Sequence, residues 1–181
     1  SINKNDKKEL RIFNETSCDL PVDPSNNVAS VGIDALRKEL GTDQGFDIHF
    51  EMKINPGSGV GSSAASAAAA VFGANELLGC PLITTQLLPY VLEGEFVASK
   101  SLHADNAAPA LLGGFILIRS YNPIDLIHLQ YPKELICVVV HPDIEIKTAE
   151  SRKLIPENIS MKTALKQCGN IAALTTGLST D

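Results

Sequence analysis

A glycine-rich segment with neighbouring serines precedes an alanine-rich stretch, and its residue types suit the binding of phosphate. The segment reads Pro56, Gly57, Ser58, Gly59, Val60, Gly61, Ser62 and Ser63. Glycines let backbone N–H groups approach an anion, and a helix that begins here adds unpaired amides and the positive end of its dipole. Serine hydroxyls can contact phosphate oxygens or a magnesium ion. The spacing predicts a phosphate-binding loop, and a plain glycine-rich turn between a strand and a helix is the alternative.

Two better-known glycine motifs do not fit this segment. A Walker-type loop requires a lysine after its last glycine, but Ser62 follows Gly61, and no lysine occurs between Lys53 and Lys100. A dinucleotide-binding fingerprint that starts at Gly57 requires a glycine where Ser62 stands. The loop is therefore expected to hold phosphate in another structural context.

The residues before the loop alternate between apolar and polar side chains from Phe46 to Ile54. A strict period of two is typical of a strand with one buried and one solvated face, which suits an antiparallel sheet better than a parallel one. Periodicity and end signals predict further elements. These are helices at 26–40, 62–78 and 87–98, strands at 45–54, 114–119 and 135–140, and a helix through 161–172 with one face on a core.

Composition excludes several classes of protein. The 181 residues are 44% hydrophobic and 20% charged, with a net charge of −6, so binding to nucleic acid is not expected. No apolar run is long enough to predict a membrane span. The scattered cysteines lack the spacing of a zinc site and are expected to be buried thiols in a reducing cytoplasm, and they are Cys18, Cys80, Cys137 and Cys168.

Four segments together resemble the GHMP small-molecule kinases, and within that family they are most similar to the homoserine kinases. The first two are Gly59-Val60-Gly61-Ser62-Ser63-Ala64-Ala65 and His103-Ala104-Asp105-Asn106-Ala107-Ala108-Pro109 with Gly113-Gly114-Phe115. The other two are Asp23-Pro24-Ser25-Asn26-Asn27-Val28-Ala29 and Thr148-Ala149-Glu150-Ser151-Arg152. Their common order over residues 19–152 is more specific than any one of them.

The resemblance implies an α+β fold, with the GHMP kinase N-terminal domain as a ribosomal-protein-S5-like two-layer sandwich around a mostly antiparallel sheet. Residues 1–142 are expected to form this nucleotide-binding domain, incomplete at its start, and residues 143–181 to begin a C-terminal α+β domain. The family's first and third motifs do not occur in the sequence. We therefore expect the chain to be part of a protein of family length and to have little activity alone.

The resemblance also implies that ATP and Mg²⁺ are bound. Loop residues 56–63 and Asn27 are expected to contact ATP, and Ser63 and Glu95 to bind Mg²⁺. Glu95 lies eleven residues before Asn106, at the position of the family's glutamate. From the residues alone, Glu95 could be a solvated helix charge, Glu93 is a competing carboxylate, and Asn27 could simply cap the following helix.

The expected acceptor is L-homoserine, bound by His103, Asn106, Thr148 and Arg152. An arginine with a hydroxyl four residues away could clamp a carboxylate, although a lone helix arginine is more often a surface charge. Asn106 can orient a hydroxyl but cannot take its proton, so catalysis without a protein base is expected. Asp105 is more readily explained as a helix N-cap than as that base.

The resemblance therefore favours a cytoplasmic homoserine kinase of threonine biosynthesis that assembles as a homodimer. Two alternatives remain. One is a GHMP kinase for another small alcohol, such as mevalonate or shikimate. The other is a nucleotide-binding relative without activity.

Overall fold

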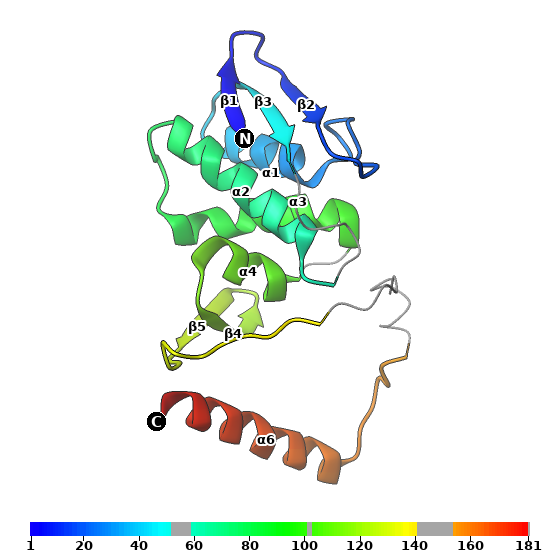
Figure 1. Cartoon of the computed structure of the whole chain (residues 1–181), viewed down its shortest axis with the longest axis vertical. Helices are drawn as coiled ribbons and strands as arrows, with labels where there is room; N and C mark the ends of the chain where they lie inside the picture. Colours follow the sequence, from blue (N-terminus) through cyan, green and yellow to red (C-terminus); the bar gives the residue numbers. More distant parts are fainter. Residues whose placement is uncertain (52–58, 101–102, 141–153, 181) are drawn as a thin grey trace. The chain divides into compact units, whose positions relative to one another are not determined.

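The computed structural model describes residues 1–51, 59–100, 103–140 and 154–180 of the chain. The chain divides into two compact units, Ser1–Gly113 and Gly114–Asp181, each of which combines helices and strands (Figure 1). The expected α+β fold class is therefore confirmed. The predicted domain boundary at 142/143 falls outside the described residues and stays a prediction.

The sheet of the first unit has three strands in the order β1-β3-β2. Its central strand, β3 (Gly45–Phe50), pairs antiparallel with β1 (Ile2–Asn5) and parallel with β2 (Leu10–Asn14). The apolar residues of β3 are buried and the polar ones are only half-buried, as the alternation predicts. The antiparallel expectation holds only for β1, because helix α1 forms the crossover between β2 and β3 and so makes that pair parallel.

Three helices pack together beside this sheet, and they hold most of the buried apolar residues (Figure 1). They are α1 (Val28–Glu39), α2 (Ser62–Leu77) and α3 (Leu88–Ser99). The short 3-10 helix η1 (Thr84–Leu87) precedes α3. Pro89 lies in the first turn of α3, where no backbone N–H is needed for the helix ladder. All three predicted helices are therefore present, within one or two residues of the expected ends.

The alanines of α2 allow close packing around this helix. Ala64, Ala67, Ala68 and Ala74 are almost completely buried, and α2 contacts α1, α3 and α4 (Ala104–Leu112). The helix ends as its glycine signal predicts, since Gly79 has a φ of 91° in the left-handed region just beyond the last turn. This packing places α2 beside α3 and α4, which carry the predicted site residues Glu95 and Asn106.

The second unit contains a two-stranded antiparallel sheet of β4 (Phe115–Tyr121) and β5 (Ile124–Leu129), and the helix α6 (Met161–Ser179). Ser160 caps α6 by accepting a hydrogen bond from the Thr163 backbone N–H. The strand predicted at 114–119 and the helix predicted through 161–172 are thus present, whereas β5 was not predicted.

Three expectations about this sequence are wrong. Residues 135–140 form no strand in the described structure, and Ile136 and Val140 are more than 80% exposed. A strand needs a neighbour for its backbone groups, and no described strand pairs with this run. Helix α6 buries no residue, so its apolar face does not lie on a core here. The cysteines are not buried either: Cys18 is half-buried and the other three are exposed.

Candidate active site

The start of helix α2 is uncapped and positioned by two left-handed glycines. Gly61 is the N-cap residue with φ 74° and ψ 36°, and Gly59 has φ 77°. No side chain of a described residue caps the helix start. The amides of the first turn therefore remain unused by a cap, at the end of the helix that carries partial positive charge. Pro56, Gly57 and Ser58 of the predicted loop lie outside the described residues.

Ser63 in the first turn of α2 contacts Glu95 in the middle of α3. The Ser63 hydroxyl donates a hydrogen bond of 3.1 Å to Oε2 of Glu95. Glu95 is only 8% exposed, whereas Glu93 on the same helix is exposed. The structure thus favours Glu95 over its competitor, and it contradicts the interpretation of Glu95 as a solvated helix charge.

Burial is the main influence on the ionisation of Glu95. It raises the pKa of the carboxyl above its usual value, the hydrogen bond from Ser63 opposes this, and the negative charge of Asp105 adds to it. A nearby cation would stabilise the ionised form at this position.

The oxygen pair of Ser63 and Glu95 fits the requirements of Mg²⁺. Magnesium binds oxygen ligands at 2.0–2.1 Å in an octahedron, so neighbouring ligand oxygens lie about 3 Å apart. The hydroxyl and carboxylate oxygens are 3.1 Å apart. Within the described residues no group of three or more His, Cys, Asp or Glu side chains could hold a metal. A site with two protein oxygens completed by phosphates and water needs no such group.

Helix α4 brings Asn106 to the start of α2. A Cβ added at Gly61 would lie 2.9 Å from Cγ and 3.0 Å from Oδ1 of Asn106. The Asn106 side chain therefore lies directly against the last glycine of the loop while it remains exposed to solvent. Sequence reasoning missed this contact. The spacing of buried alanines at 104, 107 and 108 could have revealed the helix, but not its position.

His103 and Asp105 lie at the start of helix α4, and contact between His103 and the acceptor stays a prediction. His103 is the N-cap residue of α4, in extended conformation and without a side-chain capping bond. Asp105 lies in the first turn of the helix and is exposed, so the prediction that Asp105 itself is the N-cap is wrong. Helix α4 begins at Ala104, so Asp105 lies inside the helix rather than before it. A carboxylate in the first turn still interacts favourably with the helix dipole.

Asn27 caps helix α1 and is 4% exposed. Its Oδ1 accepts a hydrogen bond of 2.9 Å from the Ala29 backbone N–H, and its Nδ2 donates one of 2.7 Å to the carbonyl oxygen of Pro21. Both ends of the side chain are thus engaged within the fold. This supports the capping alternative, and contact between Asn27 and adenine stays a prediction. Thr148 and Arg152 lie outside the described residues, so the predicted carboxylate clamp also stays a prediction.

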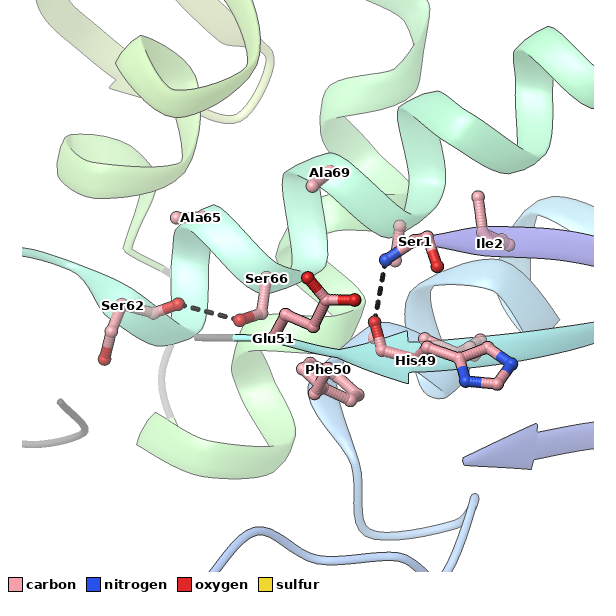
Figure 2. Close-up of a pocket in the computed structure, with 12 residues that line it drawn as sticks. Ser1, Ile2, His49, Phe50, Glu51, Ser62, Ala65, Ser66 and Ala69 are labelled. Carbon is pink, nitrogen blue, oxygen red and sulfur yellow. Dashed lines mark hydrogen bonds between the residues drawn. The ribbon is translucent and has the colours of Figure 1, made fainter. Parts of the chain in front are cut away.

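A cavity of about 360 Å³ lies on another face of α2. Figure 2 shows Ser62, Ala65, Ser66 and Ala69 of α2 opposite Phe50 and Glu51 at the end of β3. The Ser66 hydroxyl donates a hydrogen bond of 3.0 Å to the carbonyl oxygen of Ser62. Ser62 is shared with the predicted loop, but Ser63, Glu95 and Asn106 do not line the cavity. The polar groups suited to chemistry and this mostly apolar cavity are therefore separate features.

Comparisons with known proteins bear on the same part of the chain. Residues 27–114 match the model of the GHMP kinases N terminal domain. The homoserine kinase of Chlorobium phaeobacteroides is 49% identical over 167 residues, which cover 89% of this chain and 52% of that protein. The homoserine kinase of Methanococcus vannielii is 34% identical over 166 residues, which cover 92% of this chain and 54% of that protein. The chain thus spans about half the length of the curated relatives that it matches.

Comparison with a solved structure shows that the chain has the fold of a known homoserine kinase. The crystal structure of homoserine kinase from Cytophaga hutchinsonii superposes with a TM-score of 0.89 at 39% sequence identity. The match covers 98% of this chain and 57% of that chain. Among the described helices, none combines the length and the apolar content that a membrane span requires.

Proposed function

Because this chain belongs to the GHMP kinases, whose N-terminal domain it carries in residues 27–114, we propose that it transfers the terminal phosphoryl group of ATP to the side-chain hydroxyl of L-homoserine. The observation that carries the proposal is the meeting of three elements at one helix start. Ser63 of α2, Glu95 of α3 and Asn106 of α4 surround the uncapped end at Gly61. The similarity of the chain to homoserine kinases supports homoserine as the acceptor.

The chain's first task is to hold the phosphates of ATP. Phosphoryl transfer asks a protein mainly for positioning and for neutralisation of charge. The amides that follow Gly61 point out of an uncapped helix start, where the dipole adds positive potential. Gly59 and Gly61 add no side chains of their own to this surface. Residues 56–58 are proposed to contribute to ATP binding as well.

Ser63 and Glu95 would hold Mg²⁺, for which their oxygen spacing is suitable. When bound, the ion would neutralise negative charge on the phosphates. The hydrogen bond that the Ser63 hydroxyl donates to the Glu95 carboxylate holds these two oxygens side by side.

Asn106 would orient the acceptor hydroxyl. Its carboxamide can donate and accept hydrogen bonds but cannot take up a proton at neutral pH. The acceptor oxygen would form its bond to the terminal phosphorus as the bond to the ADP oxygen breaks. The hydroxyl proton would then leave late, to the transferred phosphate itself and from there to solvent. The products would be ADP, O-phospho-L-homoserine and one proton.

His103 at the start of α4, with Thr148 and Arg152, would bind the amino-acid part of the acceptor. A guanidinium can hold a carboxylate through two parallel hydrogen bonds, and this arrangement would distinguish homoserine from alcohols without that group. Such a reaction belongs to threonine biosynthesis. We further propose that the protein is a homodimer and that it is located in the cytoplasm. The cytoplasm is reducing, and this location is consistent with the exposed free thiols of Cys80, Cys137 and Cys168.

An ADP-release assay on the full-length protein tests the proposal. ATP and Mg²⁺ are supplied with homoserine, mevalonate or shikimate in parallel reactions. Selective turnover of homoserine is expected. Turnover of another alcohol would instead identify a different acceptor, and nucleotide binding without turnover of any acceptor would identify a relative that has lost activity.

A further inference from the structure

The contact between Gly61 and Asn106 joins the predicted phosphate loop to the predicted acceptor-binding helix. Three atoms of the Asn106 side chain crowd the place of a Cβ at Gly61: Cγ at 2.9 Å, Oδ1 at 3.0 Å and Cβ at 3.1 Å. Real Cβ atoms essentially never approach another atom closer than 3.0 Å. The Asn106 amide can thus occupy its observed position only because residue 61 has no side chain.

Comparison with Gly59 distinguishes the effect of the Asn106 contact from the effect of the left-handed backbone conformation, which also favours glycine. Its φ of 77° is almost the same as the 74° of Gly61, so alanine would strain the backbone similarly at both positions. Among the described residues, no atom lies within 4 Å of a Cβ added at Gly59. Only at position 61 does a side chain both strain the backbone and displace Asn106.

We propose that Gly61 is a positioning residue for the acceptor, because the space it leaves open holds the Asn106 side chain beside the start of the phosphate-binding helix. This rests on the proposed function, in which Asn106 orients the acceptor hydroxyl. An alanine at position 61 pushes the exposed Asn106 amide away from the loop and moves the acceptor relative to the phosphate. A displacement of about 1 Å at a reacting centre can reduce the rate about a hundredfold.

The test compares Gly61→Ala with Gly59→Ala in the full-length protein. Both variants are expected to weaken ATP binding to a similar extent, within about threefold of each other, because both carry the same backbone strain. Gly61→Ala is expected to lose a further ten- to hundredfold, roughly, in kcat/KM for homoserine. Isothermal titration with an ATP analogue and initial-rate kinetics measure the two quantities separately, and unfolding midpoints show whether a variant is merely misfolded.

The same pair of substitutions in an Asn106→Ala background completes the test. Asn106→Ala removes Cγ and Oδ1. In this background the kcat/KM values of the Gly59→Ala and Gly61→Ala variants should therefore differ by less than about threefold. If Gly61→Ala does not fold alone, recovery of its unfolding midpoint in the double variant would reveal the same contact.

Equal losses in kcat/KM for Gly59→Ala and Gly61→Ala would overturn the positioning role, as would a difference that persists without the Asn106 amide. Absence of homoserine turnover by the unmodified protein would instead contradict the proposed function, and the inference would fall with it.

Discussion

Glu95 is a carboxylate in a buried position on α3, where it accepts a hydrogen bond from Ser63. Its pKa is raised because burial disfavours the charged form, with the hydrogen bond from Ser63 acting in the opposite direction. A group whose pKa is raised in the folded state binds protons more readily folded than unfolded. Its contribution to stability is therefore lost as pH rises through the folded-state pKa.

We predict that Glu95→Gln increases the stability of the metal-free protein but removes activity. At pH 8 the amide eliminates the burial of a charge, so the unfolding midpoint should rise, whereas near pH 4 the two proteins should differ little. The rate of phosphoryl transfer should fall about a hundredfold or more, because an interaction with developing charge is lost. Thermal unfolding at both pH values and ADP release measure these effects.

Glu93→Gln is the matched control, since Glu93 is exposed and lies two residues earlier on the same helix. It should leave both the midpoint and the rate nearly unchanged. A stability of Glu95→Gln below that of the unmodified protein at pH 8 would contradict the inferred cost of burying this carboxylate.

At the scale of elements, glycine allows helices α1 and α3 to cross closely. A Cβ added at Gly94 would lie 2.2 Å from the Val28 carbonyl oxygen and 3.4 Å from Cβ of Ala67. The first of these atoms belongs to the backbone at the start of α1, so it cannot move aside as a flexible side chain can. Gly94 directly precedes Glu95, and the close approach of the helices therefore also fixes the position of the site carboxylate.

Gly94→Ala should destabilise the protein by about 1–3 kcal/mol, the usual cost of inserting atoms into a packed core, despite the better helix propensity of alanine. Gly169→Ala in α6 provides the control, because no atom of the described part of the chain lies within 4 Å of a Cβ added there. That substitution should stabilise the helix by about 0.5–1 kcal/mol. Urea unfolding measures the free energy of unfolding of both variants. Equal changes in this free energy for Gly94→Ala and Gly169→Ala would refute the close crossing of α1 and α3.

The solvated face of the sheet carries an acid-sensitive ion pair. Arg11 on β2 lies opposite Asp47 on β3, and its guanidinium contacts both carboxylate oxygens. Asn5 of β1 donates a further hydrogen bond of 2.6 Å to the same carboxylate. The hydrogen bond from Arg11 is the main reason that the pKa of Asp47 lies below its ordinary value. This carboxylate thus joins all three strands.

Asp47→Asn should lower the urea midpoint at pH 7, and the difference from the unmodified protein should close as the pH falls below the ordinary pKa of an aspartic acid. A lowered pKa means that stability is present above the ordinary pKa and is lost as the pH falls through the folded-state pKa. Asp43→Asn is the comparison, since Asp43 pairs with Lys8 and both side chains are 68% exposed. Its effect should be smaller, because exposed pairs contribute little. If the urea midpoints of Asp47→Asn and the unmodified protein differed by the same amount at all pH values, the proposed electrostatic cause would be excluded.

At the scale of the whole molecule, burial is uneven along the chain. The buried apolar residues of the described structure all lie in the unit Ser1–Gly113, in the helices and strand β3. In the unit Gly114–Asp181, helix α6 buries no residue, and residues 135–140 are exposed and belong to no helix or strand. Stability against local opening should therefore differ strongly between the two units.

Amide hydrogen exchange on the 181-residue chain should show this difference. The slowest amides are expected in α1, α2, α3 and β3, where opening exposes the core. Amides of α6 should exchange at least about a hundredfold faster, because helices without packing are only marginally stable in water. Protection of α6 equal to that of α2 would mean that a surface not described here covers its apolar face.

The sequence alone predicted the features that depend on neighbouring residues. Alternation identified β3, and helical spacing and end signals identified α1, α2, α3 and α6. The glycine-rich segment indicated where α2 begins, while phosphate binding there stays a prediction. Strand and helix periods, caps and left-handed glycines act over a few residues, so they can be recognised in the sequence. The matching segments also indicated the family before any geometry was known.

Only the tertiary structure decided the features that depend on distant residues. It placed Ser63 against Glu95, which is 32 residues away along the chain, and Asn106 against Gly61. It also made β2 parallel to β3 and left residues 135–140 without a described partner strand. Such contacts follow from how helices and strands pack, and packing depends on the whole set of side chains at an interface rather than on any local pattern.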